Sequence, residues 1–308
     1  MPLVPRPVQS DAGLLDLAQA RWTAIEAAQP GLRPALQVQR HVLPIVIELV
    51  GVLREQPLPK LSLPAGYVAA KLSSGVPAFS AEPVPLPIPV LVPYVVRLAK
   101  ELACSGAGPA AERIAAAVQD RQIDAATLLA ASFARDVQSV RAAAVRQALV
   151  PDLVWLIAEL ATCPFGHALQ QVVLGRSRHE ALAHALQRWI HGYCPACGSW
   201  PALAEVIDER QVLRCSFCAT AWRLDPQGCV YCTSRDGTSH QAGIDSRSDE
   251  SRIETCGTCR GYLKIVRVAS LSPFPLLAIT DLETMTLDVH AMAQGYSRPA
   301  PRQHGRAP

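Results

Sequence analysis

The stretch CPACGSWPALAEVIDERQVLRCSFC, residues 194–218, holds two Cys-x-x-Cys pairs that are separated by seventeen residues. The chain repeats this arrangement further on, where Cys229 and Cys232 are followed after twenty-three residues by Cys256 and Cys259. The first spacing lies within the range of four-thiolate metal sites, and the second is slightly longer. The repeat therefore predicts two metal sites, one for each quartet of cysteines.

Eight thiols are the predicted ligands, and each quartet can close one tetrahedral site. Four thiolates around one ion are typical of iron and zinc, so we expect two metal ions of either kind. We predict a sequential pairing, although an interleaved pairing, in which the first pair joins the third, stays open. The predicted ligands are Cys194, Cys197, Cys215, Cys218, Cys229, Cys232, Cys256 and Cys259.

The tight turn within each cysteine pair should point both sulfurs at one ion. Gly198 and Gly257 are expected to supply the backbone angles that such turns use. His191, three residues before the first cysteine of the repeat, is an alternative ligand. Four basic side chains are expected to offset the negative charge of the thiolates: Arg214, Arg223, Arg260 and Lys264.

The cysteine pattern is compatible with more than one chemical role. Metal ions can simply fold a segment whose apolar core is too small, which is the usual role of such sites. Iron centres with a redox role are the second interpretation. A thioredoxin-like dithiol is disfavoured because its motif lies on a βαβ unit and occurs once. A disulfide framework is typical of small secreted chains and is disfavoured for a cytosolic one.

The sequence before residue 190 predicts an all-helical bundle domain, residues 1–190. Its apolar residues recur at helical spacing, and prolines mark many of the segment ends. The proline-rich stretch from Gly75 to Pro93 is expected to form an extended connector. The predicted helices cover residues 14–28, 33–55, 93–104, 109–120, 123–134, 136–149, 151–162 and 166–190.

From His191 on, the pattern changes to cysteine pairs, turn signals and short β-prone runs at 211–214 and 263–269. We predict two tandem metal-binding ribbon modules over residues 191–270, each a β-hairpin with two metal-binding turns. A C-terminal helical segment is expected at 271–296 and a disordered tail at 297–308. The fold class is therefore α+β.

Composition and charge restrict the classes of partner and the cellular compartment that we expect for this chain. From residue 190 on, eleven Arg and one Lys face twelve Asp and Glu, which disfavours a nucleic-acid partner because such binding needs a basic face. The N-terminus lacks the pattern of a secretory signal, and the apolar runs are too short or too interrupted by proline to span a bilayer. We expect a cytoplasmic protein without membrane insertion.

We do not expect an enzyme. Neither a Ser/His/Asp arrangement, nor a P-loop, nor a pattern of paired carboxylates stands out in the sequence. A helical domain joined to a metal-stabilised module is instead suited to gripping another protein.

Several short motifs resemble the formate dehydrogenase accessory protein family FdhE. They are YCPACGSWP at 193–201, LRCSFCATAWR at 213–223, CVYC at 229–232, CGTCRGYLKIV at 256–266, and DLETMTLD with GYSRP further on. The resemblance is close over about 190–299 and looser through the helical region. All eight family cysteines have counterparts here. One departure is Arg260, where the family usually has glycine, and this puts the local turn in question.

The resemblance implies a cytoplasmic maturation factor that binds the immature catalytic subunit of a respiratory formate dehydrogenase before export. It also implies that the two modules hold rubredoxin-like iron sites. The alternative is an iron–thiolate redox protein that protects or reduces the metal centres of its client. The oligomeric state stays open, with a homodimer as one option.

Overall fold

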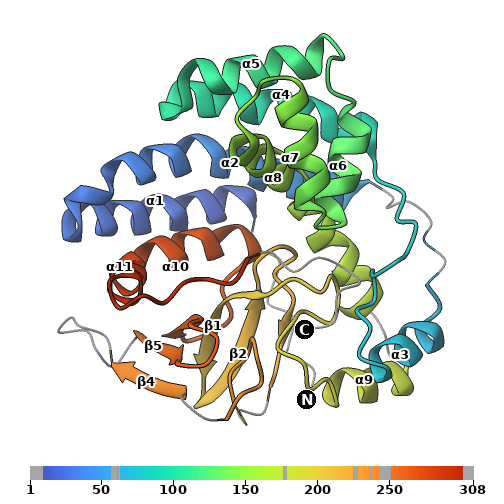
Figure 1. Ribbon diagram of the computed structural model, residues 1–308, viewed down its shortest axis with the longest axis vertical. Coiled ribbons are helices and arrows are strands. Elements are labelled where there is room, and N and C mark those ends of the chain that lie inside the picture. The colour runs from blue at the N-terminus through green and yellow to red at the C-terminus, as the bar shows by residue number, and fades with distance from the viewer. Residues whose placement is uncertain are drawn as a thin grey trace. The chain divides into compact units, whose positions relative to one another are not determined.

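The computed structural model describes residues 10–56, 61, 63–175, 179–224, 228–235, 238–242 and 251–300, with only the backbone described at 238–242. The chain divides into two compact units (Figure 1). The helical unit draws on residues 5–61 and 83–169, and the ribbon unit on residues 62–82 and those from 170 on. A separate domain ending at residue 190 stays a prediction, and the expected disorder of residues 301–308 lies outside the described residues.

The helical unit consists of amphipathic helices that bury their aliphatic faces. Ser10, Asp124 and Asp136 accept backbone hydrogen bonds at three of the helix N-termini, as good N-cap residues do. The helices are α1 (Asp11–Ala28), α2 (Arg33–Glu55), α4 (Ile88–Leu102), α5 (Gly108–Gln119), α6 (Ala125–Phe133), α7 (Val137–Arg146) and α8 (Pro151–Gln170). Fully buried leucines of α2 and α4, among them Leu36 and Leu98, lie at the centre of this unit.

Helix α2 contains a strongly apolar stretch. With the short turn before it, it forms a 26-residue helical stretch, Pro30–Glu55, that is long and apolar enough to cross a membrane. The core helix of a soluble protein passes the same test, and 44% of its most apolar window is buried. Helix α2 packs against α1 and α4 of its own unit. The finding is therefore weak evidence for a membrane span.

Two expected boundaries, the end of a helix at residue 162 and the start of the next at residue 166, are wrong. Helix α8 continues through Pro164 and ends at Gln170. A proline cannot donate to the carbonyl four residues earlier, which here is Leu160. The thiol of Cys163 donates to that oxygen over 3.7 Å, and the surrounding turn is buried. The expected helix at 166–190 is wrong as one element, since its second half is the separate helix α9 (Glu180–Gln187).

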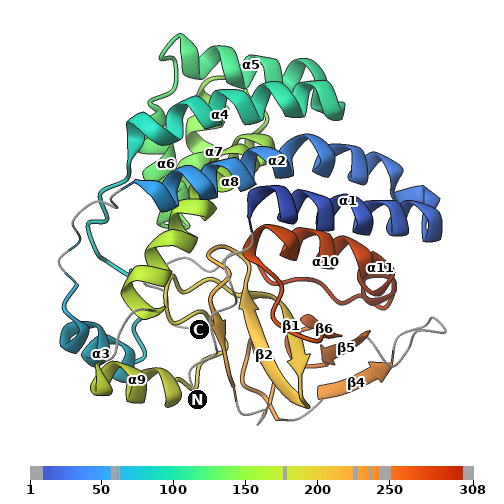
Figure 2. The same cartoon turned by 180° about the vertical axis from the view of Figure 1, so that it is seen from behind.

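The proline-rich stretch was also predicted too long, since α4 begins at Ile88. Prolines are tolerated in a first helical turn, where the amide hydrogens have no partner in the helix. A further helix, α3 (Ala65–Ser73), was missed. Figures 1 and 2 show α3 beside α9, and both belong to the ribbon unit.

A six-stranded sheet forms the centre of the ribbon unit. Its strands are β1 (Pro201–Ile207), β2 (Arg210–Cys215), β3 (Ala221–Trp222), β4 (Thr238–Ala242), β5 (Ser251–Cys256) and β6 (Tyr262–Arg267). They lie in the order β3-β2-β1-β6-β5-β4. Neighbouring strands are antiparallel except β1 and β6, which are parallel and join the modules. The two modules are thus arranged head to tail, as two copies of one unit placed side by side.

Two short helices, α10 (Leu277–Glu283) and α11 (Met285–Ala293), cover one face of the sheet (Figure 2). Leu277 packs on Leu203 of β1, and Leu287 packs on Ile253 of β5. The fold is therefore the expected α+β arrangement of N-terminal helices, two cysteine modules and a helical C-terminal segment.

Candidate metal centres

All four Cys-x-x-Cys pairs adopt the same turn. In each turn the amide of the first cysteine donates to the carbonyl oxygen five residues later, over 2.8 or 2.9 Å. These pairs are Cys194 with Ser199, Cys215 with Thr220, Cys229 with Ser234, and Cys256 with Gly261. Each bond closes the turn behind the cysteine pair and fixes both sulfurs on one side of the backbone.

The fourth residue after the first cysteine is left-handed in every turn. Its φ is 75° at Gly198, 55° at Ala219, 60° at Thr233 and 57° at Arg260. Only the first of these is a glycine, so three turns hold a side chain in a conformation that favours glycine. The expected role of Gly257 is wrong, because Arg260 takes the left-handed position in that turn. The departure at Arg260 nevertheless leaves the turn formed.

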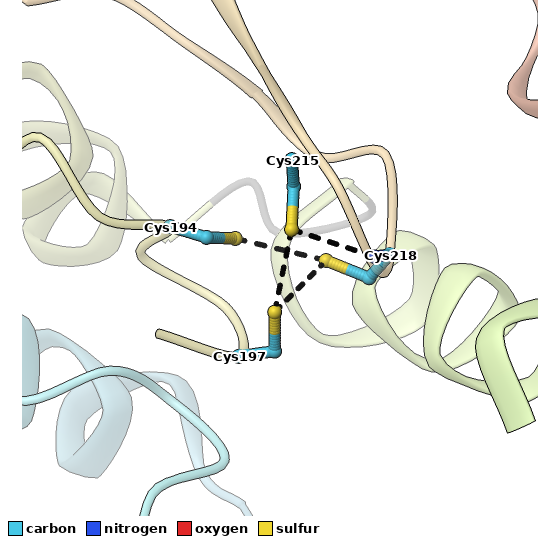
Figure 3. Close-up of side chains that lie close together, drawn as sticks. All are labelled: Cys194, Cys197, Cys215 and Cys218. Atoms are coloured by element: carbon cyan, nitrogen blue, oxygen red, sulfur yellow. Dashed lines mark hydrogen bonds between the residues drawn. The ribbon is translucent and has the colours of Figure 1, made fainter. Parts of the chain in front are cut away.

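The first cluster brings together the two pairs of the first module (Figure 3). Its sulfurs lie 3.6 Å apart between Cys194 and Cys218, and 3.4 Å apart between Cys197 and Cys215. No side chain of the cluster is more than 1% exposed. The amides of Phe217 and Cys218 both point at the sulfur of Cys215, over 3.4 Å. Such donors stabilise a thiolate.

The second cluster has the same plan but is more open. Its sulfurs lie 3.6 Å apart between Cys229 and Cys259, and 3.7 Å apart between Cys232 and Cys256. The amide of Tyr231 points at the sulfur of Cys229 over 3.4 Å. Cys229 and Cys256 are buried, whereas Cys232 is half-buried and Cys259 is exposed.

The clusters settle the pairing that the spacing left open. Within each quartet the ligand atoms all lie within 4.8 Å of one another, and the quartets are the sequential ones. His191, the alternative ligand, belongs to neither cluster. Its ring stacks on Tyr193 with the centroids 4.8 Å apart. The sequential prediction is therefore confirmed.

The thiols of a cluster cannot all ionise without a cation. Burial raises the pKa of the Cys194 and Cys218 thiols far above the ordinary value. Burial also acts against ionisation of Cys197, but hydrogen bonds from the other three thiols hold its pKa well below the usual range. A bound cation would replace those protons and allow four thiolates at neutral pH.

The basic side chains expected near the thiolates have other partners. Arg214 forms a buried ion pair with Glu205 and also donates to the carbonyl oxygen of Ser272 over 2.9 Å. Lys264 is 1% exposed and lies 2.6 Å from the carboxylate of Asp288. The expectation that they offset the thiolate charge is therefore wrong for these two residues. Their charge is needed to pair the buried carboxylates.

A segment far away in the sequence covers the first cluster. The amide of Ala78 donates to Pro195 over 2.8 Å, and that of Phe79 donates to Ala196 over 2.9 Å. Both acceptors lie between the first two cysteines, and both donors are buried. The hydroxyl of Tyr193 reaches back to Gly75 of the same segment, over 2.8 Å. Sequence analysis missed this cover because the residue types of a proline-rich stretch do not indicate which distant carbonyl oxygens its backbone amides will bond to.

Aromatic side chains lie between the two clusters. Trp200 follows the first turn, and Tyr231 lies between the cysteines of the third. Their rings meet edge to face with the centroids 5.4 Å apart, and Trp200 also meets Tyr193 edge to face with the centroids 6.2 Å apart. The two modules thus share one aromatic layer at their junction.

The donor set and the shape of both clusters fit a four-coordinate thiolate-bound ion. Four sulfurs around one centre, held by four matching turns and supported by backbone amides, are what iron or zinc takes in such sites. Each cluster can therefore hold one metal ion. The chemistry of a closed site of this kind is mainly structural, because no position is left for a substrate.

Comparison with known sequences supports the resemblance seen in the motifs. Residues 228–303 match the family model described as FdhE, C-terminal domain. The FdhE homolog of Aquifex aeolicus is 35% identical over 118 residues, which are 36% of this chain and 40% of that protein. Protein FdhE of Escherichia coli O127:H6 is 31% identical over 110 residues, 34% and 35% of the two chains. These matches span less than half the length of the relatives.

The fold has a counterpart over nearly the whole chain. The crystal structure of the FdhE protein from Pseudomonas aeruginosa aligns with a TM-score of 0.62 and 20% identity, covering 98% of each chain. At this identity the match concerns the fold. The resemblance to FdhE is thus confirmed by the family model over residues 228–303, and the likeness over nearly the whole chain is one of fold.

Proposed function

We propose that this chain, whose residues 228–303 match the FdhE C-terminal domain model, is an accessory factor for formate dehydrogenase. In this proposal it binds the immature catalytic subunit in the cytoplasm and holds it until its cofactors are in place and export begins. The sequence similarity to FdhE proteins, which includes the second cysteine cluster, carries the proposal.

The proposed ligands are the eight cysteines of the two clusters, with one iron or zinc ion in each. The metal ions supply folding free energy to a unit whose hairpins are short. Each ion ties two turns together, one before and one after a hairpin, so the module loops cannot open while it is bound. The chain itself contributes the four turns, the amides that face the sulfurs and the cover of the first cluster.

The DLETMTLD and GYSRP motifs support a role for the C-terminal residues in shaping this unit. Asp288 of the first motif accepts from Tyr262 over 2.6 Å and from Arg298 of the second motif over 2.7 Å. Arg298 also reaches Asp281 over 2.5 Å. These motif residues hold α10 and α11 on the sheet. We therefore place client recognition on other, exposed residues of the chain.

Capture of the client tests the proposal. The tagged chain is recovered from cytoplasmic extract, and a formate dehydrogenase catalytic subunit is sought by mass spectrometry. The matched variants are Cys194→Ser/Cys197→Ser, which removes half of the first cluster, and Cys104→Ser, which changes an exposed cysteine outside both clusters. We expect capture by the wild type and by Cys104→Ser, with loss in the double variant. No capture by any form would contradict the proposal.

The iron–thiolate redox protein is kept as a second candidate because the second cluster is partly open to solvent. An exposed iron–thiolate centre can exchange electrons with a partner, whereas zinc cannot. Spectra of protein purified without oxygen distinguish the two candidates. A ferric–thiolate band that disappears on reduction and returns on oxidation favours the redox candidate, and tightly held zinc removes it.

A further inference from the structure

The two clusters differ in what lies over their last turn. In the second turn of the first module, Phe217 is 1%, Cys218 0% and Ala219 5% exposed. The equivalent residues of the second module, Thr258, Cys259 and Arg260, are all exposed. The two modules share their turn geometry, so the difference comes from the side chains and segments around the turns.

The first module owes its burial to added cover. The amides of Ala78 and Phe79 bond to the first turn, and the ring of Phe217 fills the space beside the second turn. In the second module, Tyr231 covers the inner side of the fourth turn. A Cβ built on Gly261 would meet the Tyr231 ring at 2.9 Å and the Cys259 sulfur at 3.2 Å. The outer side of Cys259 faces solvent.

The fourth turn is held from outside mainly through Arg260. Its guanidinium donates to the carbonyl oxygen of Gln294 over 2.5 Å and stacks 4.1 Å from the ring of Tyr296. Its carbonyl oxygen accepts from the amide of Ser297 over 2.9 Å. These contacts fix the backbone of the turn but leave the Cys259 sulfur uncovered.

We infer that the second cluster is a ligand-exchange site, in which an external thiol replaces Cys259 at the metal, whereas the first cluster keeps all four of its ligands. The incoming thiol gives up its proton and forms the new sulfur–metal bond. The bond from the metal to Cys259 breaks, and the Cys259 thiolate takes up a proton, so no oxidant or reductant is needed. This inference rests on the proposed metal ligands and is independent of the proposed role toward formate dehydrogenase.

Functional consequences follow from the difference in access. A centre with one replaceable ligand can pass its ion to, or share it with, a thiol of a partner or a small molecule. A sealed centre of the same composition can only stabilise the fold. The chain would therefore carry one structural and one exchangeable site built from the same motif.

Zinc release and cysteine labelling test the inference on the full chain. Protein loaded with two equivalents of zinc is mixed with glutathione and the chromogenic chelator 4-(2-pyridylazo)resorcinol, and parallel samples are quenched with iodoacetamide for peptide mass spectrometry. We expect one equivalent of zinc to be released at least about tenfold faster than the other. Cys259 and Cys232 should be labelled in that fast phase, before any cysteine of the first cluster.

Two further cysteines serve as internal references. Cys104 is exposed and should be labelled at once, whereas Cys163 is buried in α8 and reports opening of the helical unit. Release of both equivalents at one rate, or labelling of the first cluster at the same rate as Cys259, would overturn the inference. Failure of the chain to bind zinc or iron would overturn the ligand assignment along with it.

A variant gives a second readout that does not depend on global folding. Cys259→Ser removes the exposed ligand and is expected to abolish the rapidly released equivalent, while the other equivalent is still released at the wild-type slow rate. Loss of the slow equivalent in this variant would show that the sealed site lies elsewhere, and would contradict the inference.

Discussion

Gly192 lies against the carbonyl group of Val230 so closely that a Cβ on residue 192 would come within 1.8 Å of the Val230 oxygen. Gly192 lies two residues before the first cysteine of the first cluster, and Val230 follows the first cysteine of the second. The backbones of the two modules therefore touch at this point. Only a glycine fits at this contact. The requirement comes from the lack of space for a side chain, since the φ of Gly192 is not in the left-handed region.

Substitution of Gly192 by alanine should destabilise the ribbon unit because the Val230 backbone cannot move away without shifting a metal-binding turn. We expect Gly192→Ala to lower the free energy of unfolding by about 2 kcal/mol or more, in the range of overpacked sites. Gly66→Ala is the control, since its Cβ would meet nothing within 4 Å and it lies on the exposed face of α3. It should be neutral or stabilising by up to about 1 kcal/mol. Urea unfolding measures both.

The left-handed residues of the cysteine turns predict changes of opposite sign. Thr233→Gly should stabilise the unit by about 1 kcal/mol, because a β-branched residue is strained at a φ of 60°. Gly198→Ala should destabilise it by about 1 to 2 kcal/mol, because an alanine would take on the strain that glycine avoids at 75°. Thermal unfolding of metal-loaded protein gives both values. Equal signs for the two variants would contradict this account of the turns.

The buried ion pair between Lys264 and Asp288 gives a third prediction. Asp288→Ala leaves Lys264 with only the Asp281 side chain and carbonyl oxygen, and removes the acceptor of Tyr262. We expect a loss of about 3 kcal/mol in unfolding free energy, as for other broken buried pairs. Arg141 and Asp152 form a solvent-exposed pair, so Asp152→Ala should change stability by less than about 1 kcal/mol. Similar losses for the two would contradict the assigned role of the buried pair.

The N-cap of α7 predicts a pH effect in the helical unit. Hydrogen bonds from the side chain and the amide of Ser139 hold the pKa of Asp136 below its ordinary value. A carboxyl group whose pKa is lowered by folding stabilises the native state above its unfolded pKa, and this contribution is lost as the pH falls through the folded pKa. Asp136→Ala should therefore cost about 1 kcal/mol at pH 7 and less below about pH 3.

Unfolding of the variant and the wild type at both pH values measures this difference. Asp136→Asn provides the control, because asparagine is an equally good N-cap without a charge. Asp136→Asn should be less stable than the wild type at pH 7, and the difference in unfolding free energy should become small at pH 3. An Asp136→Ala cost that is the same at both pH values would contradict the lowered pKa.

Cysteine spacing was enough to predict two four-cysteine clusters and to favour their sequential pairing, but it left an interleaved pairing open until the structure showed which pairs lie together. It was not enough to predict which residue of the turn is left-handed. Gly257 looked suited to that position, but the hydrogen bond from Cys256 to Gly261 places Arg260 there instead. Fixed turn geometry outweighed the preference of a single residue.

Local sequence patterns also predicted most helices. They failed where a helix end depends on an unusual hydrogen bond or where a side chain pairs with a residue far away in the sequence. Pro164 reads as a helix end, yet the thiol of Cys163 replaces the hydrogen bond that it removes. The sequence suggests that Lys264 and Arg214 are charges available to the thiolates. Instead Lys264 pairs with Asp288 of helix α11, and Arg214 pairs with Glu205 of the neighbouring strand β1. Such long-range partners carry no local signal.

Formate-dependent respiration in the living cell tests the central claim most directly. The gene for this chain is deleted in its host, and formate dehydrogenase activity is measured with and without a plasmid that restores the chain. Formate dehydrogenase activity should be lost on deletion and return with the wild-type chain, but not with Cys194→Ser/Cys197→Ser. Undiminished activity in the deletion strain would contradict the proposal that the chain is an accessory factor for this enzyme.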